Sequence, residues 1–441
     1  MRRGTWLSTV AVALLPACAG CAELPAFPGA EGFGATTPGG RGGQVIAVTN
    51  LDDAGPGSFR EAVMTPGPRI IIFRVGGTID LASGIRINEP FLTIAGQSAP
   101  GGGICLRNYG LSIRDTHDVV VRHLRVRPGD TSRKAIDGIT VHQSKRVVID
   151  HCSASWGIDE VLSVTASEDV TVQWCIISES LHDSFHEKGP HGMGSLISYN
   201  GHGGISFHHN VYAHHNSRNP RPGGLEGEPG FTLDFRNHVI YNWGSACGYN
   251  GILPQKINYV ANFLRPGPST RESQIHRAFR INGAGTSFYA ARNVVDGYPE
   301  ATQDNWLMIV TGGEITREQV EATEPHPAAP ITEHPTDELL HALAADCGAA
   351  LPERDAADAR VIADILGGTG SIINSQDEVG GWPELAAGEA PADSDGDGMP
   401  DSWEAEHGLD GQSALDGPED ADADGYTNIE EFLNRTDPRA V

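Results

Sequence analysis

The stretches DVVVRHLRVRPG (118–129), RVVIDHCSASWG (146–157) and DVTVQWCIISES (169–180) repeat one short pattern. Each begins with alternating β-branched residues, reaches a polar residue and continues into a second short apolar run. Such alternation predicts strands in which every second side chain faces a core. The pattern recurs over roughly residues 90–297, and one polar or sulfur-bearing residue marks each repeat: Cys152, Cys175, Asn210, His238, Asn262 and Asn293.

These marker residues are 23, 35, 28, 24 and 31 positions apart, which is typical of stacked coils with insertions of variable length. The chain has no tight two-residue hairpins, so we predict an all-β fold, a right-handed parallel β-helix, rather than a sandwich. A single coil cannot bury its inward face, so the stack has to be continuous. We expect the marker residues to form an internal ladder with a structural role.

We divide the chain into four segments by where the repeat begins and ends and by changes in composition. We predict a signal peptide over residues 1–22, the β-helix over 23–300, an extension over 301–390 and an acidic tail over 391–441. The extension loses the repeat, and TREQVEA, TDELLHALAADCG and RDAADARVIADIL indicate short helices packed on the side or end of the β-helix.

The overall charge of −26 argues against nucleic acid as a partner, because phosphate binding needs clustered Lys and Arg. The hydrophobic fraction of 39% is too high for a disordered chain. We expect a monomer.

The N-terminus resembles an export signal. Arg2 and Arg3 precede an apolar run that is too short for a stable membrane anchor. Small residues around Cys18 and Cys21 fit release by cleavage, whereas LPAC (15–18) resembles a bacterial lipobox. The protein is therefore expected to be secreted, or to be a surface lipoprotein that contacts membrane only through a lipidated Cys18 or Cys21. Five cysteines remain, an odd number that leaves at least one thiol free.

The segment HHNVYAHHNSRNPRPGG (208–224) places Arg218 and Arg221 on either side of a proline. Pro220 and Pro222 restrict the backbone, so two guanidinium groups are expected in set positions. The simpler alternative is that the arginines pair with surface acids such as Glu226.

Several further motifs occur in a specific order: AFPGAEGFGATTPGGRGG, VTNLDDAGPGSFREAV, GLSIRDTHDVVVRHLRVRPGD and INYVANFLRPGP. Over residues 26–300 the chain thereby resembles the pectate lyases of the parallel β-helix type, in the subgroup found in many bacteria. The resemblance implies that Asp137, thirteen residues before Asp150, binds a catalytic Ca²⁺. Asp159 and Glu160 match the place of further ligands, but the usual second ligand there falls near Ser163, so the choice between Asp159 and Glu160 stays open.

The resemblance also assigns the basic residues. Lys188 and Arg221 would bind an acidic plant cell-wall polysaccharide, and Arg218 would remove the C5 proton, after which the bond at C4 breaks by β-elimination. Calcium on the sugar carboxylate would stabilise the carbanion-like transition state. An arginine base implies activity that rises at alkaline pH.

The tail contains two segments with the spacing of calcium loops, DSDGDGMPDSWE (393–404) and DADADGYTNIEE (420–431). The predicted ligands are Asp393, Asp395, Asp397, Asp401 and Glu404 in the first and Asp420, Asp422, Asp424, Asn428 and Glu431 in the second. The tail resembles dockerin and thrombospondin type 3 repeats, so it would either bind a docking module or stiffen the chain. A merely acidic, disordered tail is the alternative.

Two other functions stay open. A polygalacturonase-like glycoside hydrolase would use Asp137, Asp159 and Glu160 as paired acids. A non-catalytic β-helix would bind cell-wall polysaccharide or act as an adhesin. The preferred methylation of the substrate and endo or exo action are not determined by the sequence.

Overall fold

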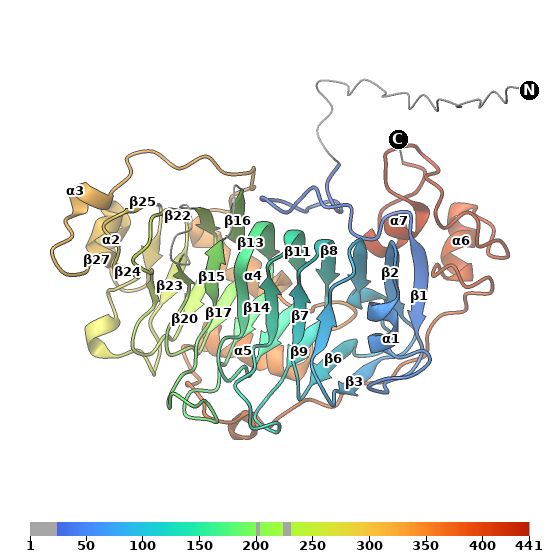
Figure 1. Ribbon diagram of the computed structural model, residues 1–441, viewed down its shortest axis with the longest axis horizontal. Coiled ribbons are helices and arrows are strands. Elements are labelled where there is room, and N and C mark those ends of the chain that lie inside the picture. The colour runs from blue at the N-terminus through green and yellow to red at the C-terminus, as the bar shows by residue number, and fades with distance from the viewer. Residues whose placement is uncertain (1–23, 200–202, 224–230, 441) are drawn as a thin grey trace, which may run out of the picture.

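The computed structural model describes residues 24–199, 203–223 and 231–440 (Figure 1). The predicted signal peptide, with Cys18 and Cys21, lies outside the described residues, and so does Glu226. Within these three ranges, no helix is both long and apolar enough to cross a membrane.

The chain winds into a parallel β-solenoid of about 10 turns, which confirms the predicted all-β fold class. Every strand pair is parallel, and one long sheet runs the length of the molecule (Figure 1). The strands of this sheet, in spatial order, are β1 (Gln44–Val48), β2 (Arg69–Phe73), β5 (Leu92–Ala95), β8 (His117–Arg122), β11 (Lys145–Asp150), β13 (Leu162–Gln173), β16 (Gly204–His208), β19 (Thr232–Arg236), β22 (Gln255–Val260) and β25 (Thr286–Ala291).

Two further faces complete each coil. The second sheet contains β3 (Gly77–Asp80), β6 (Ile104–Arg107), β9 (Arg125–Arg127), β12 (Ser153–Ser155), β14 (Ile176–Ser178), β17 (Val211–Ala213), β20 (Val239–Tyr241), β23 (Phe263–Arg265) and β26 (Val294–Val295). The third face contains β4 (Ile85–Ile87), β7 (Leu111–Arg114), β10 (Ile139–His142), the first half of β13, β15 (Leu196–Tyr199) and β18 (Arg221–Pro222). A separate small sheet joins β21 (Gly248–Tyr249), β24 (Phe279–Ile281) and β27 (Ile309–Thr311).

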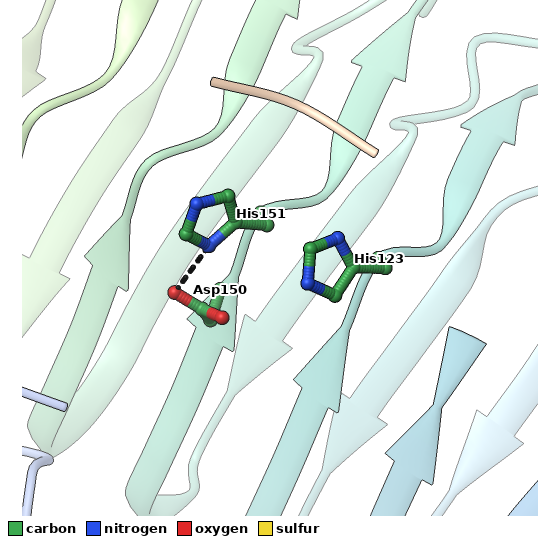
Figure 2. A group of neighbouring side chains, drawn as sticks. All are labelled: His123, Asp150 and His151. Atoms are coloured by element: carbon green, nitrogen blue, oxygen red, sulfur yellow. Dashed lines mark hydrogen bonds and ion pairs between the residues drawn. The ribbon is translucent and has the colours of Figure 1, made fainter. Parts of the chain in front are cut away.

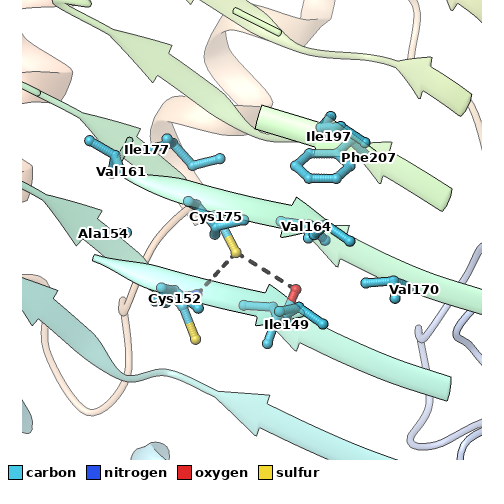
Figure 3. Close-up of a cluster of buried hydrophobic side chains, with 14 of the residues drawn as sticks. Ile149, Cys152, Ala154, Val161, Val164, Val170, Cys175, Ile177, Ile197 and Phe207 are labelled. Atoms are coloured by element: carbon cyan, nitrogen blue, oxygen red, sulfur yellow. Dashed lines mark hydrogen bonds between the residues drawn. The ribbon is translucent and has the colours of Figure 1, made fainter. Parts of the chain in front are cut away.

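The core lies inside the solenoid because alternate residues of each strand point inward. Val147, Val170 and Ile205 follow one another in register and are fully buried. Figure 3 shows Ile149, Val164 and Phe207 in this interior, together with two cysteines of the marker series. The five cysteines in the described part of the chain are buried and free, so they act as small apolar residues.

The predicted internal ladder is present. Each marker residue accepts a hydrogen bond from the backbone N–H of the marker one coil before it, from Cys152 N–H to Cys175 Sγ at 3.4 Å through to Asn262 N–H to Asn293 Oδ1 at 3.0 Å. Asn305, which the sequence pattern did not reveal, extends the series by accepting from Asn293 at 2.8 Å. The ladder satisfies backbone groups that the turns would otherwise leave unpaired inside the core.

Helices cover the outside of the solenoid. Those with α-helical geometry are α1 (Phe59–Met64), α2 (Glu300–Gln303), α3 (Arg317–Val320), α4 (Thr336–Asp346), α5 (Ala356–Gly367), α6 (Asp401–His407) and α7 (Asn428–Asn434), and the 3₁₀ turns are η1 (Gly96–Ser98), η2 (Glu272–Gln274), η3 (Asn305–Met308) and η4 (Gln376–Val379). The three helical segments predicted in the extension correspond to α3, α4 and α5. Apolar residues of α4 and α5 pack on the second sheet.

The acidic tail packs on the solenoid. Met399, Ile429 and Leu433 bury their side chains against Ile70 and Ile72 of β2, and Figure 1 shows α6 and α7 beside β1 and β2. The boundary at residue 300 is also less sharp than the sequence pattern suggested, because β27 pairs with β24.

We predict that Asn293→Ala lowers the free energy of unfolding by about 2–4 kcal/mol, because it leaves the Asn262 N–H and the Tyr259 carbonyl unpaired in the core. Urea unfolding measures the change. Gln303→Ala on α2 removes an exposed amide instead and should change stability by less than about 0.5 kcal/mol. Equal effects of the two substitutions would contradict the structural role of the ladder.

Candidate active site

Three predicted acidic residues meet where two neighbouring coils enter the third face. Asp137 precedes β10, and Asp159 and Glu160 precede β13, which pairs with β10 in parallel register. Each of the three offers a carboxylate oxygen, and these oxygens lie within 4.8 Å of one another. The structure therefore brings together the three acids that the sequence singled out.

Asp137 is tied to the local backbone. Its Oδ1 accepts a hydrogen bond from the Glu160 N–H at 3.2 Å, and its Oδ2 accepts one from the Thr140 hydroxyl at 3.1 Å. Burial, reinforced by the charge of Asp159, raises the pKa of Asp137 to about 7. Ser163 is buried beside this carboxylate, so its neutral hydroxyl, and no further acid, adjoins Asp137 at this position.

Asp159 and Glu160 have different partners. Asp159 faces two histidines, with 2.9 Å from its Oδ1 to His191 Nε2 and 3.6 Å from its Oδ2 to His186 Nε2. The two imidazole rings are stacked with centroids 3.9 Å apart. Glu160 instead forms an ion pair with Arg218. Sequence reasoning missed both histidines, although HEKGPH (186–191) places them five residues apart in one short loop.

The two arginines are held by the backbone of Ser195, the residue that precedes β15. The Arg218 carbonyl accepts from the Ser195 N–H at 2.8 Å, and the Arg221 N–H donates to the Ser195 carbonyl at 2.9 Å. Arg218 Nε also donates to the Tyr249 hydroxyl at 3.3 Å, and the Arg221 guanidinium carbon lies 5.9 Å from the centre of the Tyr249 ring. Burial and the neighbouring Arg218 charge lower the pKa of Arg221. The acid that pairs with Arg218 is thus a residue of the acidic cluster.

Lys188 is exposed in the loop that carries the two histidines. Its backbone N–H donates to His186 Nδ1 at 3.0 Å. Burial lowers the pKa of His191, and the charge of Lys188 adds to this effect. Lys188 therefore belongs to the same group of residues as Asp159.

The third face carries an outward row of residues along the solenoid axis. Successive coils place there, in register, Arg86, Ser112, Thr140, Ser163, Leu196 and Arg221. A cavity of about 550 Å³ adjoins Asp137 and is lined by Arg114, Lys134 and Tyr109. A second cavity of about 410 Å³ includes Tyr249, Arg277 and Arg280 on the other side of the two central arginines. Basic side chains thus flank the acidic cluster in both directions along the axis.

Another group of possible metal ligands lies on the outside of the long sheet, and Figure 2 shows its members, His123, Asp150 and His151. The Asp150 carboxylate is already occupied, because it accepts from Arg122 Nε at 2.8 Å, from Gln173 Nε2 at 2.8 Å and from His151 Nδ1 at 2.9 Å. This arrangement is that of a buried ion-pair network. Burial alone would lower the pKa of His151, but Asp150 raises it to about 9.

Comparisons with known proteins agree with the fold and indicate a family. A family profile described as "Pectate lyase" matches residues 18–225. The chain is 36% identical over 431 residues to "Probable pectate lyase C" of Emericella nidulans, covering 97% of this chain and 96% of the relative. The protein of the same name from Aspergillus flavus is 34% identical over 426 residues, covering 94% of each chain. These relatives are fungal and give no support for the bacterial subgroup.

Solved structures show the same fold. The cedar pollen allergen Jun a 1 superposes with a TM-score of 0.55 at 18% identity, covering 72% of this chain and 92% of the allergen. The chain is thus a protein of the parallel β-helix fold. At 36% identity over nearly its full length to a named relative, it belongs to the pectate lyase family and is an enzyme of that class.

The His151–Asp150 pair predicts a pH-dependent stability. The folded-state pKa of about 9 exceeds the ordinary 6.5, so the stabilisation is complete below pH 6.5 and is lost as the pH rises through about 9. We expect the free energy of unfolding to fall by up to about 3 kcal/mol over that window. Urea unfolding across the window measures it, and His151→Gln should flatten the dependence. An unchanged slope in the variant would contradict the assignment.

Proposed function

We propose that this enzyme cleaves polygalacturonate by calcium-assisted β-elimination after export from the cell. The observation that carries the proposal is the Arg218 guanidinium held against Glu160, at the edge of the Asp137–Asp159 pair. The candidate base, Arg218, is thereby in direct contact with Glu160, one of the three candidate cation ligands. The export part rests on the N-terminal sequence alone.

The residues present fit a calcium ion. Asp137, Asp159 and Glu160 supply hard carboxylate oxygens within 4.8 Å of one another, the ligand type that Ca²⁺ prefers. The two histidines would instead suit a transition metal. However, His186 Nδ1 accepts the Lys188 N–H, so the proton of the neutral ring is on Nε2, the atom that faces Asp159. In that tautomer His186 Nε2 carries a hydrogen and cannot bind a metal, and at 3.6 Å it makes no hydrogen bond to Asp159.

Arg218 is the candidate base. Calcium bound to the sugar carboxylate would make the C5 proton more acidic and stabilise the negative charge that develops. Arg218 is kept in position by Glu160 and by the Tyr249 hydroxyl, and its guanidinium must lose a proton before it can accept one from C5. The electron pair from the C5–H bond would then form the C4–C5 double bond as the C4–O bond breaks, and the departing glycosidic oxygen would take a proton from solvent. This requirement accounts for the expected rise of activity at alkaline pH.

The flanking surface suits an acidic polymer that lies along the solenoid axis. Coils are stacked about 4.8 Å apart, so side chains from successive coils form a continuous row along the axis. Arg114 and Lys134 on one side, and Arg277 and Arg280 on the other, offer cations to carboxylates on both sides of the cleaved bond. Lys188 and Arg221 lie between them and would orient the central sugars.

The geometry argues against a glycoside hydrolase. A hydrolase needs two free carboxyl groups on either side of the glycosidic bond, one of them as an acid. Here Glu160 is held in an ion pair with Arg218, and oxygens of all three acids converge on one point, as suits a shared cation. A non-catalytic adhesin is disfavoured by membership of an enzyme family.

We predict that Arg218→Lys lowers kcat on polygalacturonate by about 10²–10⁴-fold, because it removes the base while keeping the charge. The ultraviolet absorbance of the unsaturated product measures turnover. Arg317→Lys, at an exposed arginine on α3, is the matched control and should leave kcat within about twofold. Retention of most of the activity by Arg218→Lys, with an intact circular dichroism spectrum, would rule out Arg218 as the base.

We predict that catalytic calcium binding strengthens as the pH rises through about 7, because the protonated Asp137 carboxyl cannot bind the ion. Asp137→Asn should raise the calcium concentration that gives half-maximal activity by about tenfold or more. The activity is titrated with calcium at several pH values. Without calcium, the raised pKa also means that folded-state stability falls as the pH rises from about 4 to 7. A calcium affinity independent of pH over this range would contradict the role of Asp137.

A further inference from the structure

Four carboxylates converge in the tail, far from the catalytic residues in sequence. Oxygens of Asp395, Asp397, Glu404 and Asp416 lie within 4.8 Å of one another. The first three belong to the predicted first loop. Asp416 does not: it follows Glu404 by twelve residues and comes from the segment that connects α6 to the second loop.

The hydrogen bonds of the aspartates leave one oxygen of each free. The bonded oxygen of Asp395 accepts from the Asp397 N–H at 3.2 Å, that of Asp397 from the Met399 N–H at 2.8 Å, and that of Asp416 from the Asp410 N–H at 2.9 Å. The other oxygen of each aspartate is buried and has no hydrogen-bond partner in the described chain.

Glu404 is the most deeply buried member of the cluster. It is 0% exposed, and neither of its carboxylate oxygens has a hydrogen-bond partner among the described residues. An ionised carboxylate without a partner is costly to bury, and three more carboxylates surround this one. Burial and the neighbouring Asp397 raise the pKa of Glu404 to about 7. In the part of the chain that the structure describes, no ion pair links any of the four acids to Lys or Arg.

Two predicted ligands of the first loop have other partners. Asp393 forms an ion pair with Arg74 at 3.2 Å, and Asp401 accepts from both the N–H and the hydroxyl of Ser394 at 2.7 Å. The spatial cluster therefore differs from the linear motif at these positions, and Asp416 replaces them.

We propose that Asp395, Asp397, Glu404 and Asp416 bind one calcium ion that latches the tail onto the first coils of the solenoid. The free oxygens form a ligand set of carboxylate oxygens alone, which suits a hard divalent cation such as Ca²⁺. The set contains no thiolate or imidazole, the ligands that softer metals prefer. The inference concerns a site separate from the proposed catalytic one.

The loop that the ion would order is in contact with the solenoid. Gly398, at φ +97°, lies so close that a Cβ there would be 2.9 Å from Val45 Cγ1. The next residue, Met399, is fully buried against β2. The Arg74–Asp393 ion pair joins the start of the same loop to the end of β2. Ordering of this loop by an ion therefore fixes apolar and charged contacts to the first coils.

Asp416 extends the effect to the second tail helix. Its backbone carbonyl accepts from Asn428 Nδ2 at 2.8 Å at the start of α7, and the Ile429 N–H donates to the Gly417 carbonyl at 3.1 Å. From α7, Glu430 forms an ion pair with Arg41 at 2.9 Å. One ion between Glu404 and Asp416 thus links the two helices that cover β1 and β2. The tail acts as a calcium-dependent cover for this end of the sheet, and its apolar face is occupied by the solenoid.

The second tail loop could bind an ion of its own, which the test must distinguish from the proposed one. Its Asp420, Asp422 and Asp424 come within 4.8 Å of one another but are exposed or half-exposed. Asn428 Oδ1 and Glu431 Oε2 are buried without partners nearby in the chain. An ion at this second loop would contribute equally to every protein compared below.

The test counts calcium ions by isothermal titration of the full chain after removal of divalent ions. Glu404→Gln and Asp416→Asn should each bind one ion fewer than the parent. Glu406→Gln, an exposed acid on the same helix α6, is the matched control and should bind as many ions as the parent. Repeating the set in an Asp137→Asn background separates the tail ion from the one proposed at the catalytic site.

A second measurement follows the latch itself. Hydrogen exchange of residues 393–416 should slow at least tenfold on adding calcium to the parent and to Glu406→Gln, and should stay fast in Asp416→Asn. Circular dichroism checks that each variant is folded. If Glu404→Gln does not fold, Asp416→Asn alone tests the proposal. Unchanged ion counts in both variants, or equal protection of the tail with and without calcium, would overturn the proposal.

Discussion

The parallel register between successive coils is the constraint on which the rest of this enzyme depends. Pairing of Ile139 with Leu162 places the residues that precede the two strands directly above one another. Asp137 is consequently in register with Glu160, and Asp159 lies beside them, although neither strand alone would bring these acids together. The inward ladder that ends at Asn293 and Asn305 maintains this register, because each side chain satisfies the backbone of its neighbouring coil.

The same register aligns the outward side chains of the third face in one row along the solenoid axis. Small polar residues such as Ser112 and Thr140 occupy the middle of the outward row, and arginines occupy its ends. The centre of the row thereby adjoins the three clustered acids, while positive charge lies on its flanks. Loops then add what the strands cannot supply. The loop with His186 and His191 covers Asp159, and the turn at Arg218 sets a guanidinium against Glu160.

Features with a period along the chain could be predicted, and features that depend on contacts between distant segments could not. The ladder from Cys152 to Asn293 followed from the repeat, and the meeting of Asp137 with Asp159 followed from the family resemblance. The pairing of Arg218 with Glu160 did not, since the two are 58 residues apart and lie in different coils. For the same reason the motif of the first tail loop indicated acids at regular spacing but missed Asp416, and it gave no sign that the tail packs on β2.

The central claim is that acids of two adjacent coils hold one cation beside Arg218. It is tested most directly by anomalous X-ray diffraction from crystals soaked in calcium together with a short oligogalacturonate. The account predicts an anomalous peak between the carboxylates of Asp137 and Asp159, with the sugar ring lying between that peak and Arg218. A peak on His186 and His191, or no peak near Asp137 in crystals that bind the sugar, would contradict it.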